Sequence, residues 1–514
     1  MSGSLRHEFE SVTKYQQSMH TASKDKGIAS AYRLKQQRVT WTTASHEKVN
    51  PGPPVETEDG VTVSFVFDNS KSVLVESYST LVLPKLKVKK KHREAIQICW
   101  KHNSGINCIA HNAFIKNSEE PTQSFDSDWV DCYNQRYLRI SPELHDVRVG
   151  NIAELEQWNT HLPAYRTYFD QPWWYSEYPD FAYPLFLLGP TDKVRQDYVL
   201  RNNITDLLRM RKLVDGKWVE VPPNLKYLDG IKNEGKLPIP ELWVRYGKQT
   251  PKEMDQTKCD IVEGEYNEIF YHDVVAFDPS TEGRYGDTLS AVINCDYPCN
   301  SIFWALENIG YPSDDPERSS VIPLSNYTTD ESDVYSGAVP WDNLNLDING
   351  NNKFRNMKHG HFTLMDVNHH RSSPMVRGWG SWSWSDSNLG IDVDPGMVLK
   401  GTTLSVKVTD GTLRFDEGKS DSDSDHEGAP SVDPRDDVSV SSRPTEGGLT
   451  HPRPSEGGLG LTHTRQPAGS RSKAPAKVGP TFKLHVRLLV TKKLIIRPQE
   501  GGGYQITVDV IPPS

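Results

Sequence analysis

Apolar and polar residues alternate over short stretches along most of the chain, which is the pattern of β-strands that bury one face. Residues 38–43 (RVTWTT), 61–67 (VTVSFVF), 72–76 (SVLVE) and 78–83 (YSTLVL) show it in the first part of the chain. These stretches are rich in β-branched and aromatic residues, and Gly, Pro, Asn and Asp interrupt them, as in β-sandwiches and barrels. The pattern predicts an all-β protein with few and short helices.

Two aromatic stretches predict the core of the first part. Alternation at Ile96, Ile98 and Trp100, and again from residue 106 to residue 109, indicates strands that bury one face. Residues 171–188 (QPWWYSEYPDFAYPLFLL) place aromatic residues before a proline-bounded turn and an apolar strand. We expect this stretch to form a wall of a large core.

The succession of short strands begins again after a polar stretch at residues 215–236. Further strand-like stretches of the same kind lie at residues 241–247, 265–277, 288–308, 379–384 and 403–415. We therefore expect an N-terminal arm at residues 1–35, a first β domain at 36–235 and a second β domain at 236–514.

Residues 416–480 break this pattern. They are rich in Ser, Pro, Gly and acids, begin with DEGKSDSDSDHEG, and contain the imperfect repeat RPTEGGL and RPSEGGL. Few aromatic or branched apolar residues offset the entropy of ordering, so the segment is predicted to be disordered. Strand-like residues 481–498 and 504–511 follow it, which makes it a loop inserted before the last strands.

Composition narrows the class of protein. The chain has 514 residues and a formal net charge of −10 at pH 7. The length suggests two to four domains, and the negative charge argues against a protein that coats nucleic acid, which needs a basic face. No run of about 18 apolar residues predicts a membrane span, and the N-terminus lacks the apolar core of a secretory signal. Since cysteines are sparse, six in 514 residues, we expect the protein to reside in the reducing cytoplasm or nucleus.

Four histidines, His359, His361, His369 and His370, follow a predicted hairpin. Their His-Gly-His spacing is similar to that of the cupins, β-barrel proteins that bind a metal. The cupin pattern also requires a Glu a few residues later, where this chain has only Asp366. We therefore expect no metal ligand here, and a role in a loop or an interface that protonation in an acidic compartment would loosen.

Three acids, Asp126, Asp128 and Asp131, flank Trp129, and paired acids near an aromatic ring are typical of glycosidases. All three fall within six residues, so the sequence does not place two of them across a cleft. No GxSxG, P-loop, GxGxxG or HExxH motif is present. We expect no catalytic residue, no cofactor and no enzymatic activity.

Several longer segments, taken in order, carry a resemblance to a known family. The first part has ICWKHNSGINCIAHNAFIKN and FDSDWVDCYNQ, followed by PWWYSEYPDFAYPLFLL. The second part has PCNSIFWALEN, LDINGNNKF, HHRSSPMVRGWGSWSWS and KLHVRLLVTKKLIIRPQEGGGY. From residue 38 to residue 504 their order and spacing resemble double jelly-roll major capsid proteins of large eukaryotic double-stranded DNA viruses and their relatives. The family's "PSGxxNFSR"-like element is only faintly present, as DPGMVLKG, and the acidic loop is an addition.

The resemblance implies two consecutive eight-stranded jelly-roll β-barrels with long loops and one disordered insertion. It implies a homotrimer that forms pseudo-hexagonal capsomers of an icosahedral shell, and localisation in the virion after assembly in the host cytoplasm or nucleus. Neighbouring capsomers and minor capsid and penton proteins would be its partners. The basic run Lys85–Arg93 (KLKVKKKHR) would make at most a weak contact with packaged DNA, because charge runs commonly face water.

A carbohydrate-binding or carbohydrate-cleaving β-sandwich protein is the alternative, because the aromatic content suits it as well. The presence or absence of an internal duplication distinguishes these two classes of protein. A lectin-like enzyme would show one concave aromatic site, whereas a capsid protein would show two similarly oriented jelly rolls and form trimers.

Overall fold

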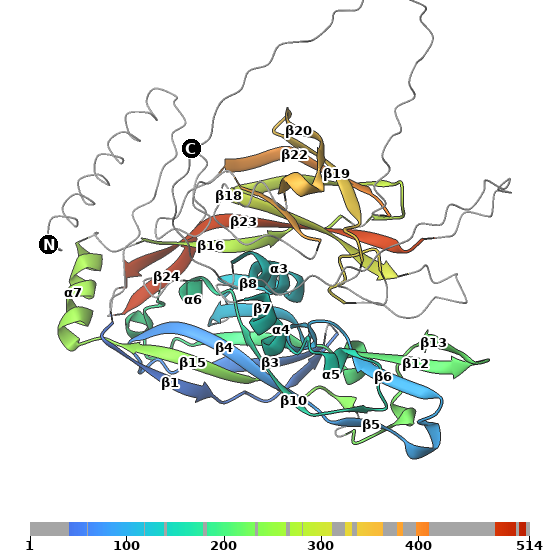
Figure 1. The fold of residues 1–514 in the computed structure, drawn as a ribbon. Helices are drawn as coiled ribbons and strands as arrows, with labels where there is room; N and C mark the ends of the chain where they lie inside the picture. The colour runs from blue at the N-terminus through green and yellow to red at the C-terminus, as the bar shows by residue number, and fades with distance from the viewer. Residues whose placement is uncertain are drawn as a thin grey trace, which may run out of the picture. The chain divides into compact units, whose positions relative to one another are not determined.

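The computed structural model describes residues 41–58, 60–117, 119–137, 141–177, 182–231, 235–263, 268–279, 281–310, 324–330, 337–362, 378–383, 397–410, 479–499 and 503–509. Most regular structure in these residues is β-strand (Figure 1). The predicted arm at 1–35 and the predicted disordered loop at 416–480, except its last two residues, lie outside them. In the described part, no helix combines the length and the apolar composition that a membrane-crossing helix needs.

Eight strands of the first half form two antiparallel sheets. In chain order they are β1 (Thr43–Val49), β3 (Gly60–Val66), β4 (Val73–Leu83), β7 (Ile109–Lys116), β8 (Gln123–Asp126), β10 (Tyr165–Asp170), β11 (Val194–Leu200) and β15 (Glu241–Lys248). One sheet has the order β1-β15-β4-β10, and the other runs β3-β11-β7-β8 with the short β2 (Val55–Thr57) at its edge. Numbered one to eight along the chain, these orders are 1-8-3-6 and 2-7-4-5.

The second half repeats this order. Its strands are β16 (Glu268–Ala276), β18 (Thr288–Gly310), β19 (Trp341–Ile348), β20 (Asn351–Lys358), β21 (Gly380–Ser383), β22 (Met397–Val408) and β23 (Thr481–Pro498), with β24 (Tyr504–Asp509) paired to the end of β23. The first part of β18 pairs with β22 and its last part with β23 and β21, so this single strand takes positions two and three. The sheets β16-β23-β18-β21 and β18-β22-β19-β20 then have the orders 1-8-3-6 and 2-7-4-5. The predicted double jelly roll is confirmed.

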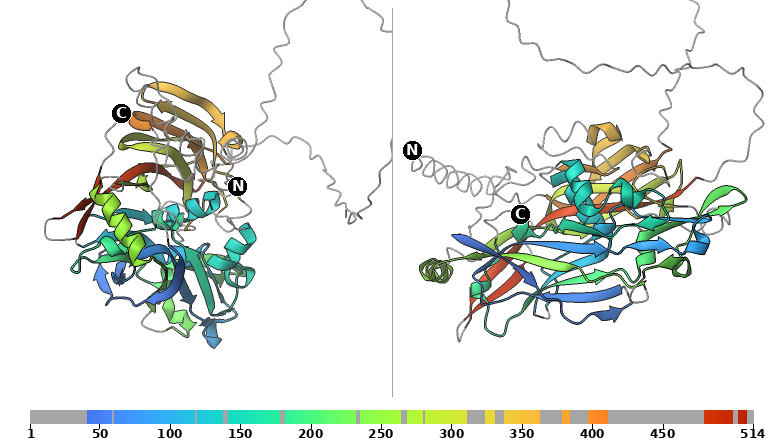
Figure 2. Two further views of the ribbon diagram at one scale, coloured as in Figure 1. Left: turned by 90° about the vertical axis from the view of Figure 1, so that its left-hand side faces the viewer. Right: turned by 60° about the horizontal axis from the view of Figure 1, so that its bottom comes forward.

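The topology assigns each connection to one end of its jelly roll. All these pairings are antiparallel, so the connections after strands three, five and seven leave from one end, here called the loop end. In the first half these connections pair with one another: β5 (Leu86–Val88) pairs with both β9 (His161–Leu162) and β14 (Leu228–Asp229). Helix α7 (Pro251–Val262) follows strand eight of the first half, at the opposite end, here called the linker end. Figures 1 and 2 show α7 and the β12–β13 hairpin (Leu208–Val214 and Lys217–Val221) at opposite ends.

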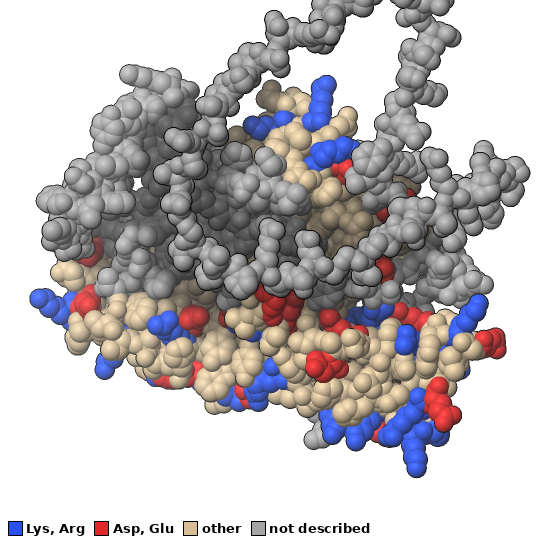
Figure 3. Space-filling view, in the orientation of Figure 1, with Lys and Arg blue, Asp and Glu red and all other residues tan. Residues whose placement is uncertain are grey.

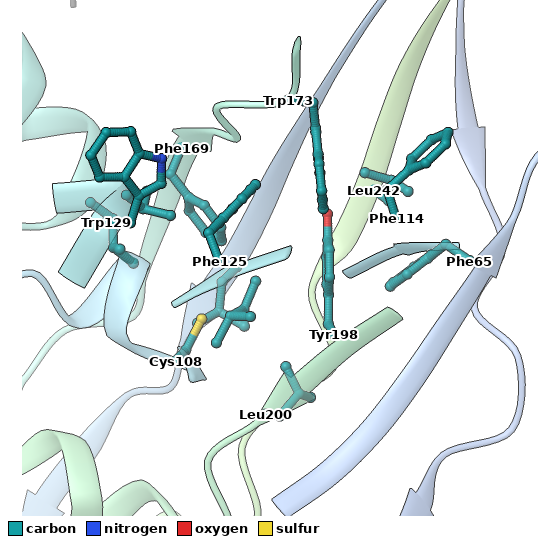
Figure 4. Packing of buried hydrophobic residues seen from close by; sticks show 14 of the residues in the cluster. Phe65, Cys108, Phe114, Phe125, Trp129, Phe169, Trp173, Tyr198, Leu200 and Leu242 are labelled. Carbon is teal, nitrogen blue, oxygen red and sulfur yellow. The ribbon is translucent and has the colours of Figure 1, made fainter. Parts of the chain in front are cut away.

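Aromatic rings fill the first jelly roll between its two sheets. Phe65 lies 5.1 Å from Tyr198, and Trp173 lies 4.5 Å from Phe125 and 6.0 Å from Phe114, measured between ring centroids (Figure 4). All five side chains are buried. Offset and tilted rings at these separations stabilise a core beyond the area they bury.

The second jelly roll shows why its aromatic strand alternates large and small residues. Trp304 of β18 pairs with Gly380 of β21. A Cβ atom on Gly380 would lie 2.6 Å from the Trp304 ring and 2.7 Å from the Trp341 ring, so only glycine fits between them. Trp379 beside it is buried, as the predicted core strand requires.

Three sequence expectations need correction. Trp41 and Thr42 precede the first strand, which begins at Thr43, and residues 38–40 lie outside the described residues. Ser104–Asn107 forms a helical turn where a strand was predicted. Leu185–Leu187 forms a short 3₁₀ helix and not a strand, since it follows Pro184, which cannot donate to a ladder. Leu185 and Leu187 are nevertheless buried, as a core wall requires.

The strand order also bears on the division of the chain. Strand β15, which the predicted boundary at residue 235 assigns to the second domain, pairs with β1 and β4 of the first. It is strand eight of the first jelly roll. We propose that the two domains meet within helix α7, and the division remains a prediction.

Candidate functional site

Strands β8 and β16 bring the two jelly rolls together. The Tyr271 hydroxyl donates to the Thr122 carbonyl at 2.8 Å, and the Gln123 amide donates to the His272 carbonyl at 3.1 Å. Ala276, five residues after Tyr271 on β16, pairs with Arg487 of β23. Arg487 in turn donates a hydrogen bond to Asp126 at 2.5 Å. The contacts advance together along both strands, so β8 and β16 run in the same direction.

This direction fixes the relative orientation of the jelly rolls. Strand β8 is strand five of the first and β16 is strand one of the second, and odd-numbered strands of a jelly roll run toward its loop end. The two loop ends therefore lie on the same side. A contact between the connections agrees with this, because Asn107 Nδ2 donates to Ser325 Oγ at 2.9 Å.

We call the contact surface around β8, helix α3 (Ser127–Tyr137), β16 and β23 the seam. Near the linker end it is aromatic: Trp174 lies 5.1 Å from Tyr271 between ring centroids. Further along, Trp129 of α3 meets Phe303 of β18 edge to face at 5.3 Å. These rings form the apolar part of the seam, and its charged part lies beside them.

Arg487 is the centre of that charged part. Its side chain is 2% exposed and binds Asp126 of the first jelly roll and Asp278 of the second. Asp128 lies 3.8 Å away. A buried guanidinium with carboxylates from both halves ties the jelly rolls in one geometry, since its fork of donors is rigid.

His485 lies two residues before Arg487, on the same face of β23. Its Nε2 lies 2.9 Å from Glu307 Oε2, and its Nδ1 lies 3.4 Å from Asp278 Oδ2 and 3.7 Å from Asp128 Oδ2. Both ring nitrogens thus face carboxylates, which suits a doubly protonated imidazolium.

The charges of this cluster perturb one another. Burial alone would lower the pKa of His485, but hydrogen bonds with Asp278 and Glu307 and the charge of Asp128 outweigh it and raise the pKa to about 10. Burial alone would raise the pKa of Asp278, yet His485 and Arg487 hold that pKa well below its usual range. His485, Arg487 and Asp278 are therefore charged at neutral pH.

Asp128, Glu307 and His485 are the described residues whose spacing could hold a metal ion, because one ligand atom from each lies within 4.8 Å of the others. Binding a metal would require His485 to give up a proton that two carboxylates stabilise. We interpret the cluster as an ion-pair network.

The structure separates the other sequence candidates from one another. Asp126 and Asp128 join the seam, whereas Asp131 accepts from Asn103 at 2.8 Å. The rings of His359 and His361 pack against aromatic rings, at 6.0 Å from Trp341 and 5.1 Å from Phe362 respectively. His369, His370 and Asp366 lie outside the described residues.

Sequence reasoning missed four residues of the seam: Asp278, Glu307, His485 and Arg487. A signal existed in the stretch KLHVRLLV, where His485 and Arg487 share one face of an otherwise apolar strand. Charged residues on the buried face of a strand require partners, so the pattern predicts buried acids opposite them.

The strand order and the matching orientation of both halves define the class: the fold is that of the double jelly-roll major capsid proteins of viruses. Two solved structures show the likeness. The PBCV-1 virus capsid, a quasi-atomic model, is 12% identical with a TM-score of 0.54, covering 93% of this chain and 99% of that chain. The Faustovirus major capsid protein is 7% identical with a TM-score of 0.55, covering 95% and 98% respectively. No family model and no curated protein matches the sequence.

Proposed function

We propose that this chain is the major capsid protein of a virus, and that three copies form a pseudo-hexagonal capsomer of an icosahedral shell. The matching direction of β8 and β16 is the observation that carries the proposal. Two jelly rolls upright in the same sense give each subunit two similar corners, and three such subunits give six. A building block of this kind requires no catalytic site.

The aromatic residues support this function over the carbohydrate-binding alternative. Trp100, Trp129, Trp173, Trp174, Trp304, Trp341 and Trp379 are fully buried. Rings that stack on a sugar must be exposed in a concave face. These tryptophans instead fill the two jelly rolls and the seam.

The finer predictions are part of the same proposal. Neighbouring capsomers and minor capsid and penton proteins are the partners that a shell requires, and the virion is the expected location. Contact with packaged DNA through Lys85–Arg93 remains a prediction, as does assembly in the host cytoplasm or nucleus.

Size-exclusion chromatography with light scattering tests the proposal on the full chain. We expect a particle with three times the mass of one chain, and negative-stain images with a six-cornered outline. A stable monomer at micromolar concentration, or a trimer with three corners, contradicts it.

A further inference from the structure

The outer face of the sheet β1-β15-β4-β10 in the first jelly roll is partly open to solvent. Strand register places Tyr78 between Trp243 and Asp170 on this face, and the Tyr78 and Trp243 rings stack with centroids 6.5 Å apart. Tyr168 and Val82 lie on the same face and are 43% and 39% exposed. We call this surface the open face. Exposed aromatic and apolar side chains that gather in this way mark a candidate contact surface.

Charged side chains surround these rings. Lys48 Nζ lies 2.7 Å from Glu241 Oε1, and Arg245 lies 3.5 Å from Glu76, and all four side chains are partly exposed. Figure 3 shows Lys and Arg beside Asp and Glu on the lower surface, where Figure 1 places β1 and β10. Aromatic rings within a rim of charges are typical of surfaces that bind another protein.

The equivalent face of the second jelly roll is covered within the chain. Its sheet β16-β23-β18-β21 turns Tyr271, Phe303 and Leu489 toward the first jelly roll, and all three are buried in the apolar cluster of the first half. Strand five of the first jelly roll, β8, and the helix that follows it, α3, cover this face in the seam. The same sheet face is therefore closed in one half and open in the other.

Strand eight shows this correspondence in a pair of arginines. Arg487 of β23 and Arg245 of β15 both lie between strands one and three on the outer face of their sheets. Arg487 reaches across the seam to Asp126. Arg245 lies over the Trp41 ring at 5.0 Å, and its Nε donates to no described residue. Arg245 therefore retains a donor for an acceptor on another molecule.

The second jelly roll has an open counterpart of β8 and α3. Its strand five is β20, and residues 359–362 continue β20 as a helical segment, as α3 continues β8. Lys353 and Arg355 of β20 are exposed, whereas Gln123 and Phe125 of β8 are buried. We call β20 with residues 359–362 the β20 side. One chain thus has one unused surface of each of the two kinds that meet in the seam.

We propose that the open face binds the β20 side of a second copy of this chain. The inference rests on the proposed capsid function and deepens it by naming the surfaces that join the subunits. A contact between unlike surfaces runs head to tail, and such contacts close into rings. Strand β20 has three basic residues and no acid, and the open face offers Glu76, Glu241 and Asp170, so their charges attract.

Photo-cross-linking of the full chain in solution tests the proposal. A photoreactive benzophenone amino acid replaces Tyr168 on the open face or, as the control, the exposed Trp218 on β13. Mixed isotope-labelled and unlabelled chains distinguish a cross-link between copies from one within a chain. We expect the probe at position 168 to reach residues 351–362 of another copy, and the probe at position 218 not to reach them.

Val82→Glu and its matched control Val219→Glu give a second measurement. Val82 on β4 and Val219 on β13 are 39% and 38% exposed, and each pairs with a basic residue of the next strand. A carboxylate enclosed at a contact loses its hydration, so we expect Val82→Glu to raise the concentration at which half the chains are trimeric roughly tenfold. Val219→Glu should leave this concentration unchanged in light scattering.

Two results would overturn the inference: trimers in which the probe at position 168 reaches any surface other than residues 351–362, and equal trimer stability in the two valine variants. Either result leaves the proposed function intact. Chains that stay monomeric and give no cross-link contradict both. An open dimer with the expected cross-link supports the inference and contradicts the proposed trimer, so the two failures are distinguishable.

Discussion

The seam and the basic run Lys85–Arg93 use the same kinds of side chains in opposite surroundings. In the seam, Arg487 and His485 are buried and each faces carboxylates from both jelly rolls. In the basic run, Lys90 and Lys91 are exposed and pair with no described acid. The difference teaches that burial decides what a cation does. A buried cation must find partners within the fold, whereas an exposed one is free to meet water or a partner outside it.

Replacing Arg487 is expected to have the largest effect. Arg487→Met leaves the partly exposed Asp126 and Asp278 without their shared cation. We expect this to lower the free energy of unfolding by about 3 kcal/mol, the lower end of the range for a fully buried pair. Urea unfolding measures it. Arg166→Met is the control, because Arg166 pairs with Glu241 at an exposed position, where the loss is about 1 kcal/mol or less. Equal losses in the two variants would contradict the role of Arg487 in the seam.

His485 gives the seam a pH dependence. Its folded pKa of about 10 lies above its usual 6.5, so its contribution is complete below about pH 6.5 and is lost as the pH rises toward 10. We expect the wild-type free energy of unfolding to fall over this range, and that of His485→Gln to change less. Urea unfolding at a series of pH values measures both, with His46→Gln at an exposed position of β1 as the control. Parallel profiles for wild type and His485→Gln would be the contrary result.

Removing one hydroxyl tests the seam more finely. Tyr271→Phe deletes the hydrogen bond to the Thr122 carbonyl, at an expected cost of about 1 kcal/mol. Tyr165→Phe deletes a similar bond to the Val147 carbonyl, but at the surface, where water replaces it. Thermal unfolding of both variants measures the difference. If the surface variant loses as much stability, the burial of the Tyr271 bond adds nothing.

The basic run Lys85–Arg93 is expected to show the smallest effect on stability. Lys90→Gln/Lys91→Gln breaks no ion pair with a described acid, so its free energy of unfolding should stay within about 0.5 kcal/mol of the wild type. Urea unfolding measures it beside the Arg487→Met variant. A loss near that of Arg487→Met would mean that the run holds the fold together instead of facing solvent.

The strands could be predicted because their cause is local. Alternation in residues 61–67 and 481–498 marks one buried face whatever the rest of the chain does, and both stretches are strands. At Leu185–Leu187 the apolar pattern predicted a strand. These residues follow Pro184 and form a 3₁₀ helix instead, and Leu185 and Leu187 still fill the core.

The seam could not be predicted in the same way. Asp126 and Arg487 are 361 residues apart in the chain, and only the arrangement of two complete jelly rolls brings them together. Asp126 and Asp128 stand beside Trp129 in the sequence, but the sequence places neither of them across a cleft and offers no cation as their partner. The basic run Lys85–Arg93 can be read from the sequence. The end of the first jelly roll at which it lies follows only from the strand order.

Strand β18 carries a mechanical consequence. It contains 23 residues and belongs to both sheets of the second jelly roll. Irregular pairing between Ile293 and Pro298 marks where it passes from one sheet to the other. Among the described residues of the first jelly roll, no strand belongs to both sheets. Under a load that shears the sheets of a jelly roll past each other, we expect the first half to yield by sliding, while the second transmits the force along its own backbone.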